Sequence, residues 1–251
     1  MPTMKVVAVI QARMGSNRLP GKMMLQLRER PVVCHVARRV GWSDMVDEVV
    51  VATTEHRRDD ILEEFATNTG ASVFRGDEQD VLGRMYDSAQ EHDADVVVRI
   101  TGDCPLIEPE IIDLAINKLI DDNLDYVSNT INRTFPRGLD AEVFSMDSFQ
   151  TVNEKSQEPH QREHVTPYFK NNTSDFTTAQ ITSDMVFDEP QFQDRTDIRI
   201  TLDESDDYKL LREIFKKFGN YDTPEIRNVI RHIDTENLDE INKSIEQKTV
   251  G

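Results

Sequence analysis

The first half of the chain alternates short apolar runs with longer segments of helical periodicity. Runs rich in β-branched residues, which are typical of buried strands, cover 4–10, 48–54, 72–76 and 95–100. Apolar residues at three- and four-residue spacing predict helices over 31–43, 57–70, 79–92 and 109–122. Strands that alternate with helices indicate βαβ units, so we expect an α/β fold with a mostly parallel central sheet.

The second half of the chain is less regular. We expect strands over 125–130, 139–145, 175–182 and 197–203, and helices over 146–155, about 160–170, 205–218 and 223–233. No internal repeat, low-complexity tract or linker divides the sequence. We therefore expect a single domain over residues 1–251, with residues 130–190 as an irregular insertion.

The charge balance restricts the class of partner. The chain has 29 Lys and Arg against 47 Asp and Glu, a net charge of −18. Nucleic acid and anionic membrane surfaces are poor partners for such a chain, because both need a basic surface. A small anionic ligand stays open if a local pocket opposes the global charge. The acidity fits either a salt-adapted source or an ordinary acidic protein.

The cysteines and the first residues of the chain indicate the cellular compartment in which the protein is expected. Cys34 and Cys104 lie far apart and in no metal-binding spacing. The first residues lack a signal-peptide pattern, and no apolar stretch reaches the roughly 18 residues that span a bilayer. We expect reduced thiols in a cytoplasmic protein with no membrane partner.

Residues 11–22, QARMGSNRLPGK, interrupt the acidic pattern with three cations, Arg13, Arg18 and Lys22. They directly follow the first strand, and parallel sheets bind ligands at the carboxyl ends of their strands. Gly15 permits a backbone turn with positive φ, and N–H groups around Gly15 and Ser16 can cradle phosphate oxygens. The spacing fits neither G-x-x-x-x-G-K-[ST] nor G-x-G-x-x-G. The loop favours binding of a triphosphate; a solvated basic loop is the alternative.

Two aspartates follow later expected strands. Asp103 in TGDCPL and Asp203 in RITLDESDD are placed to reach the same edge of the sheet. Magnesium prefers one or two carboxylates together with water and substrate phosphates. Helix capping is the alternative for both residues. Arg99 lies inside a buried strand, where an unpaired cation is costly, so we expect a carboxylate or ligand partner.

The loop ARMGSNRLPGK resembles the nucleotide-binding signature A-R-x-G-S-x-R-L-P-x-K of the cytidylyltransferases that activate acylneuraminates and 3-deoxy-manno-octulosonate. The sequence of this loop is most similar to that of the branch named for spore-coat polysaccharide biosynthesis. Further segments follow in family order: RGDEQDVLGRMYDSA, VVRITGDCPLIEPEIID, RGLDAEVFS, REHVTPYF and RITLDESDDY. The resemblance covers roughly residues 4–210.

This resemblance implies a Rossmann-like, three-layer nucleotide-diphospho-sugar transferase fold. The implied reaction is a Mg²⁺-dependent transfer of CMP from CTP to an acidic sugar, with release of pyrophosphate, in surface polysaccharide or glycan synthesis. It also implies a homodimer, and it assigns binding of the acceptor or a dimer contact to the insertion at about 130–190. Two alternatives remain: a nucleotide-sugar glycosyltransferase on the same fold, and a non-catalytic nucleotide-binding module.

The resemblance also implies a role for individual residues. Those assigned to the nucleotide are Ala12, Arg13, Gly15, Ser16, Arg18, Lys22, Thr53, Arg75, Gly76 and Arg84. Those assigned to the sugar are Arg137, Asp140, Glu142, Arg162, Glu163 and His164. Asp103 and Asp203 are the implied metal ligands, although Ser205 stands where the family often has proline. Arg13, Lys22 and Asp103 are the expected catalytic residues, since cations at the phosphates stabilise the charge that develops there.

Structural alternatives apply to some of these residues. Asp80 and Arg84 are four residues apart and fit an ordinary pair on a helix surface. Thr53 and Thr54 fit a turn at the end of their strand. Asp140 and Glu142 share one face of the expected strand, which suits recognition of hydroxyl groups, but two surface carboxylates on an edge strand are the plain alternative.

Overall fold

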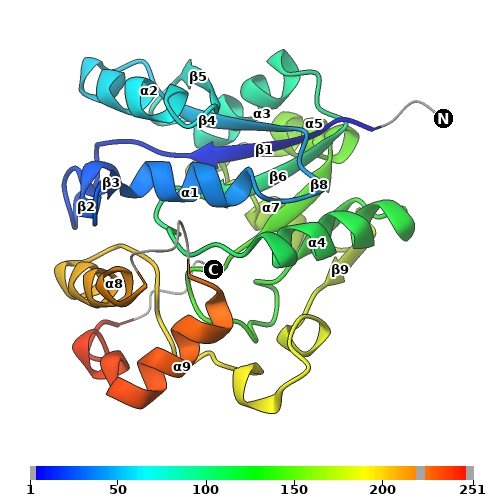
Figure 1. Cartoon of the computed structure of the whole chain (residues 1–251). Helices are drawn as coiled ribbons and strands as arrows, with labels where there is room; N and C mark the ends of the chain where they lie inside the picture. Colours follow the sequence, from blue (N-terminus) through cyan, green and yellow to red (C-terminus); the bar gives the residue numbers. More distant parts are fainter. Residues whose placement is uncertain (1–3, 219–223, 247–251) are drawn as a thin grey trace.

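The computed structural model describes residues 4–218 and 224–246. Its main sheet has the strand order β5-β4-β1-β6-β8-β7-β9 (Figure 1). The strands are β1 (Val6–Gln11), β4 (Glu48–Thr54), β5 (Ser72–Gly76), β6 (Val96–Thr101), β7 (Tyr126–Ser128), β8 (Glu142–Ser145) and β9 (Thr178–Gln180). All neighbouring strands pair in parallel except β8, which is antiparallel to both β6 and β7. The expected α/β fold with a mostly parallel sheet is confirmed.

Helices cover both faces of the sheet and make three layers (Figure 1). They are α1 (Val32–Val40), α2 (Asp60–Thr67), α3 (Val81–Glu91), α4 (Pro109–Asp121), α5 (Met146–Lys155), α6 (Pro159–His164), α7 (Pro167–Asn171), α8 (Ser205–Lys217) and α9 (Ile226–Glu236). One apolar cluster joins the sheet to α1, α2, α4, α8 and α9, and a second joins it to α3, α5 and α7. The two clusters take alternate residues of β1, which explains why residues 6–10 of this strand are all apolar.

Short elements complete the chain. A small antiparallel pair, β2 (Gln26–Leu27) and β3 (Arg30–Pro31), precedes α1. The 3₁₀ turns are η1 (Lys22–Met24), η2 (Arg57–Asp59), η3 (Ser183–Met185), η4 (Pro190–Phe192) and η5 (Leu238–Ile241). No helix in the described part of the chain is both long and apolar enough to cross a membrane.

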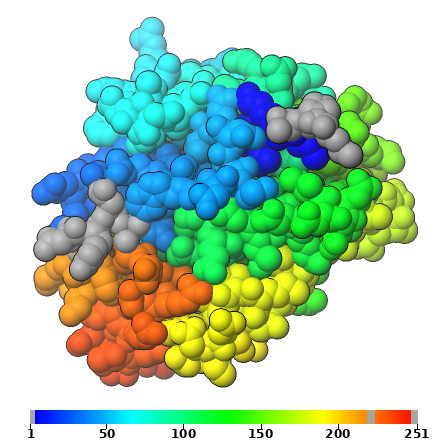
Figure 2. Space-filling view, turned by 45° about the vertical axis from the view of Figure 1, so that its right-hand side comes forward, coloured from blue at the N-terminus to red at the C-terminus, as the bar shows by residue number. Residues whose placement is uncertain are grey.

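The C-terminal helices pack against the end of the irregular region. Figure 2 shows the orange and red C-terminal segments forming one continuous surface with the yellow segment before them. Arg227 of α9 donates to the Val186 carbonyl at 2.8 Å, and the guanidinium of Arg231 lies 4.8 Å from the ring centre of Phe192. Residues 224–246 are therefore tied to the body of the molecule.

Several sequence predictions differ from the structure in the second half. The expected strand over 197–203 does not form, since its one ladder contact is an isolated bridge between Arg137 and Arg199. The helix expected over 160–170 divides into α6 and α7 at Val165, whose φ is 70°. The strand expected over 139–145 begins only at Glu142, and the one over 175–182 shrinks to Thr178–Gln180. The helix expected from 223 begins at Ile226, and residue 223 itself lies outside the described residues.

Candidate functional site

The loop after β1 is shaped by its glycines, although not as the sequence suggested. Gly21, and not Gly15, has a positive φ, at 72°. A Cβ at Gly15 would lie 2.6 Å from Nη2 of Arg58, so a larger residue there requires that flexible side chain to move. The N–H of Ser16 donates to the Met14 carbonyl, so it is engaged within the loop. The loop therefore folds back on itself and delivers Lys22 to the start of η1.

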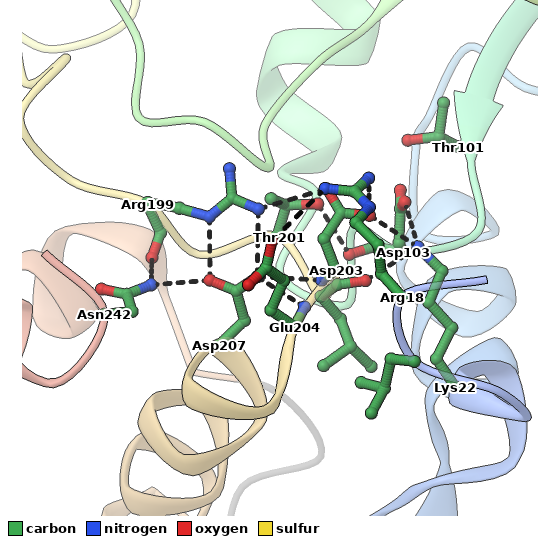
Figure 3. A network of polar contacts seen from close by, with 12 residues as sticks. Arg18, Lys22, Thr101, Asp103, Arg199, Thr201, Asp203, Glu204, Asp207 and Asn242 are labelled. Carbon is green, nitrogen blue, oxygen red and sulfur yellow. Dashed lines mark hydrogen bonds and ion pairs between the residues drawn. The ribbon is translucent and has the colours of Figure 1, made fainter. Parts of the chain in front are cut away.

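Lys22 connects two aspartates that come from distant parts of the chain (Figure 3). Its Nζ lies 2.7 Å from Oδ2 of Asp103 and 2.8 Å from Oδ1 of Asp203. It also donates to the Leu202 carbonyl at 2.9 Å. Asp103 lies two residues beyond β6, and Asp203 lies in the extended segment before α8. The aspartates predicted to share one edge of the sheet meet there.

The capping alternatives for both aspartates are wrong. Glu108 is the N-cap of α4, and Glu204 is the N-cap of α8. Oδ1 of Asp203 accepts from Lys22 and lies 3.0 Å from Nη2 of Arg18. Both carboxylates therefore face the loop after β1 and not a helix end.

The charges in this cluster stabilise one another. Burial lowers the pKa of Lys22, but the carboxylates of Asp103 and Asp203 outweigh it and leave the pKa above its usual value. Burial acts in the opposite direction on Asp103, whose pKa the Lys22 charge nevertheless brings down to about 2. At neutral pH the cluster therefore holds ionised groups, which suits binding of a metal and of phosphates.

Arg84 of α3 adds a buried cation beside the loop after β1. It is only 3% exposed, and its Nη1 donates to the Asp77 carbonyl. Its buried Nε has no hydrogen-bond partner among the described residues. Burial, reinforced by the charge of Arg13, lowers the pKa of Arg84 to about 10. A buried guanidinium of this kind fits an anionic ligand.

Two cavities meet at this cluster. The first, of about 360 Å³, is lined by the predicted nucleotide residues Ala12, Arg13, Gly15, Ser16, Arg18, Lys22 and Arg84. The second, of about 600 Å³, is lined by the predicted sugar residues Arg137, Asp140, Glu142 and His164. Both are lined by Gln11, Arg18, Thr101, Asp103, His164 and Asp203. The arrangement gives two ligands a common boundary at the two aspartates.

The second cavity contains buried ion pairs. Glu142, 2% exposed, pairs with Arg99 and, at 3.1 Å, with Lys170. Burial raises the pKa of Glu142, but Arg99 and then Lys170 bring it down to about 2. Asp140 pairs with Arg133 instead. The idea that Asp140 and Glu142 share one strand face is wrong, because β8 starts at Glu142; β8 is also internal, so an edge-strand surface is wrong too.

Three residues predicted to contact the nucleotide lie elsewhere. Thr53 is fully buried, and Arg75 pairs with Asp60 and Glu63. Neither residue, nor Gly76, lines the cavities described here.

Arg162 and Glu163 of α6, both assigned to the sugar, lie beside a third cavity. Arg162 pairs with Asp80, and both residues, with Glu163, line a space of about 410 Å³ next to the first cavity. Glu163 also lines the first cavity, whereas Arg162 lines neither of the first two. A pair between Asp80 and Arg84 does not form, because Asp80 caps α3 by accepting from the N–H of Gly83.

Sequence reasoning missed several residues that line the cavities. Gln11 and Thr101 end β1 and β6 and lie between the cavities. Arg133 and Lys170 add cations to the second cavity. Gln11 and Thr101 end the two strands whose following loops were identified, so their position was a usable signal; Lys170 lies in a short helix and carried none.

The donor set fits a magnesium ion. The described residues contain no group of three or more His, Cys, Asp or Glu side chains that would hold a metal by themselves. Asp103 and Asp203 provide two carboxylates beside a cavity lined by cations, and Mg²⁺ takes its remaining ligands from water and substrate phosphates.

Comparison with known proteins gives a consistent result. A family model described as Cytidylyltransferase matches residues 7–244. The uncharacterized protein MJ1063 of Methanocaldococcus jannaschii is 36% identical over 247 residues, 98% of each chain. The spore coat polysaccharide biosynthesis protein SpsF of Bacillus subtilis is 32% identical over 219 residues, 85% of this chain and 88% of SpsF.

A solved structure and a more distant enzyme complete the comparison. The structure of a cytidylyltransferase from Leptospira borgpetersenii has a TM-score of 0.87 at 33% identity and covers 98% of this chain and 100% of that one. The 3-deoxy-manno-octulosonate cytidylyltransferase of Geobacter metallireducens is 38% identical, but over 122 residues, 47% of this chain and 46% of that enzyme. The similarity to SpsF is thus the more extensive of the two.

Proposed function

The chain belongs to the cytidylyltransferase family, and from this premise we propose that it transfers CMP from CTP to a hydroxyl group of an acidic sugar. Pyrophosphate is the second product, and the reaction depends on Mg²⁺. The activated sugar serves surface polysaccharide or glycan synthesis, as the similarity to SpsF suggests. The family is one of nucleotidyltransferases, which favours this reaction over glycosyl transfer.

The meeting of two cavities at Lys22, Asp103 and Asp203 is the observation that carries the proposal. We assign the first cavity to CTP, because its loop residues present cations to a phosphate chain. We assign the second to the sugar. Their common boundary brings a sugar hydroxyl next to the α-phosphate, as transfer in one step requires.

Cations of the second cavity support an acidic acceptor. Arg99, Arg133, Arg137 and Lys170 line it in a chain whose net charge is −18. Asp140 and Glu142 neutralise part of this charge, and Asp140, the more exposed of the two, is available to accept hydrogen bonds from sugar hydroxyls. His164 lies on the boundary and contributes a further polar contact.

The residues of the site act mainly by charge stabilisation. The oxygen of the sugar hydroxyl attacks the α-phosphorus in line and gives up its proton to solvent; a new O–P bond forms, and the bond to the bridging oxygen of pyrophosphate breaks. Arg13, Arg18 and Lys22 stabilise the negative charge that develops on the phosphates. Asp103 and Asp203 would hold Mg²⁺, which when bound neutralises phosphate charge and orients the leaving group.

We also propose that the enzyme is a cytoplasmic homodimer. Both cysteines, Cys34 and Cys104, are free and buried, as in a reducing compartment. β9 from the irregular region is the last strand of the sheet, and an edge strand offers a surface for a second copy. Light scattering coupled to size-exclusion chromatography measures the mass: a monomer at micromolar concentration would contradict the dimer.

The reaction is tested with the four nucleoside triphosphates and a panel of acidic sugars, with and without Mg²⁺. We expect release of pyrophosphate with CTP, an acidic sugar and Mg²⁺ together. Release with neutral sugars alone would contradict the acidic acceptor. No release of pyrophosphate with any sugar, together with no measurable binding of CTP, would overturn the proposed function.

A further inference from the structure

A buried polar network lies behind Asp203 (Figure 3). Its centre is Asp207 in the first turn of α8, which is 0% exposed. Oδ1 of Asp207 accepts from Nε of Arg199 at 2.8 Å and from Nδ2 of Asn242 at 2.8 Å. Oδ2 accepts from Nη2 of Arg199 at 3.0 Å and from the backbone N–H groups of Asp203 and Glu204 at 2.9 and 3.0 Å. Both carboxylate oxygens are therefore fully engaged.

This network fixes the direction of the Asp203 carboxylate. Nη2 of Arg199 also donates to Oδ2 of Asp203 at 3.1 Å. Oδ1 of Asp203 faces the other way, toward Lys22 and Arg18. One oxygen is thus held by the protein, and the other is presented to the boundary between the two cavities.

Asn242, just beyond η5, completes the network from the C-terminal segment. It is 4% exposed, and its amide donates both to Asp207 and to the Arg199 carbonyl, at 2.8 and 3.0 Å. Arg199 is therefore held at its backbone and, through Asp207, at its guanidinium. Without Asn242, two buried acceptors lose a donor, and the arginine that holds Asp203 loses its support.

We propose that Asn242 is a positioning residue for Asp203, so that the segment from α9 through η5 completes the metal site. The inference rests on the proposed function, in which Asp203 binds Mg²⁺ together with CTP. Asn242 touches neither ligand in this proposal and acts through Arg199 and Asp207. Partners that orient a metal ligand typically change metal affinity by about 10–100-fold when they are removed.

The test compares CTP binding in Mg²⁺ with CTP binding in EDTA, by calorimetry on the full chain. The ratio of the two affinities measures the contribution of the metal, independently of turnover. We expect Asn242→Ala to lower this ratio about tenfold. The affinity in EDTA, which depends on the loop after β1, stays as in the wild type. Asn242→Ser keeps a hydroxyl donor and loses less than the alanine variant.

Asn228→Ala is the matched control, because Asn228 is an exposed asparagine of α9 whose amide donates to Glu225 at 3.2 Å and accepts from Arg231 at 3.0 Å, both on its own helix or beside it. It should leave the ratio unchanged. If Asn242→Ala lowers the melting temperature but keeps the wild-type ratio, the side chain is only structural and the inference is wrong. If the alanine variant does not fold, a wild-type ratio in Asn242→Ser overturns the inference equally. A wild-type enzyme without any Mg²⁺ enhancement would contradict the proposed metal dependence itself.

Discussion

Arg99 of β6 and Glu142 of β8 lie opposite each other in adjacent antiparallel strands and form a buried ion pair. The pair explains how a strand surrounded by apolar residues tolerates an arginine, and it confirms the expected carboxylate partner. It also fixes Glu142 on the wall of the second cavity. Stability and acceptor binding therefore depend on the same two residues.

We predict that Glu142→Gln destabilises the protein by about 3–5 kcal/mol, because it leaves Arg99 buried without its counter-charge. The double variant Arg99→Met with Glu142→Gln should lose less, since the more buried of the two cations that pair with Glu142 is then removed as well. Urea denaturation of the three proteins measures both changes. A double variant less stable than Glu142→Gln would show that the arginine does not depend on this carboxylate.

The same pair predicts a dependence of stability on pH. The pKa of Glu142 is about 2 in the folded protein against 4.5 for an ordinary glutamate. Its contribution is therefore fully present above pH 4.5 and is lost as the pH falls toward 2. The loss is on the order of 3 kcal/mol. Unfolding free energies of wild type and Glu142→Gln, measured across this range, should converge; parallel curves would contradict the prediction.

The elements at the centre of the sheet could be predicted from the sequence because their pattern is local. β1, β4 and β6 are largely buried on both faces, so each carries a run of at least three consecutive apolar residues, at 6–10, 49–52 and 96–98. Once the sheet was expected to be parallel, the ends of β1 and β6 had to lie together. This is why the loop after β1 and Asp103 were correctly placed near each other.

The segment 197–203 shows where local pattern fails. Ile198, Ile200 and Leu202 alternate with polar residues and are buried, as in a strand. Their backbone, however, bonds to loops: the N–H of Leu202 donates to the Asp103 carbonyl, and that of Ile200 to the Arg137 carbonyl. The alternation of apolar and polar residues shows that one face of the segment is buried, but it does not show which backbone groups the segment bonds to.

Individual ion pairs between distant segments could not be predicted from the sequence either. Lys22 and Asp203 are 181 residues apart; the sequence indicates that both lie at one edge of the sheet, but not that they form a direct ion pair. Arg75 is similar, because only the fold shows that Asp60 and Glu63 engage its guanidinium. The resemblance to the family provided the metal-binding interpretation of Asp203, which the residues alone did not favour over a helix cap.

Lys22→Ala should reduce the rate of pyrophosphate release by about 10²–10³-fold, the usual cost of removing one charge-stabilising donor. It also removes the cation that lies between Asp103 and Asp203, so added Mg²⁺ should raise the melting temperature of the variant more than that of the wild type. Lys216→Ala is the control, because Lys216 is exposed on α8 and pairs only at 3.5 Å with Glu213. A Lys22 variant with nearly normal turnover would exclude a catalytic role.

The two loop glycines should respond differently to alanine. Gly21 has a φ of 72°, so Gly21→Ala forces a side chain into the left-handed region and costs about 1–2 kcal/mol. A Cβ at Gly15 would contact Nη2 of Arg58 and Oε1 of Glu78, at 2.6 and 2.9 Å. Both atoms end flexible side chains, so Gly15→Ala should change stability little but weaken CTP binding, because Gly15 lines the first cavity. Urea denaturation and CTP titration separate the two effects; equal losses of stability would contradict the assignment.

Replacing Arg84 should have opposite effects on stability and on CTP binding. Arg84 is 3% exposed and lines the first cavity; its Nη1 donates to a backbone carbonyl, and its buried Nε has no hydrogen-bond partner among the described residues. Its pKa of about 10, lowered by burial and then by Arg13, shows that the folded protein disfavours its charge. Methionine has a similar shape without the charge, and replacing a buried charge in this way is often stabilising by about 1–4 kcal/mol.

Arg84→Met should therefore raise the melting temperature of the ligand-free protein and weaken CTP binding by about tenfold or more, the cost of one charged hydrogen bond. Calorimetry measures both quantities on the same preparation. Arg212→Met is the control, because Arg212 is exposed on α8 and lies 5.7 Å from the ring centre of Tyr208; it should leave CTP affinity unchanged. If Arg84→Met is destabilised and binds CTP normally, Arg84 is a structural cation of the loop after β5 and does not contact the nucleotide.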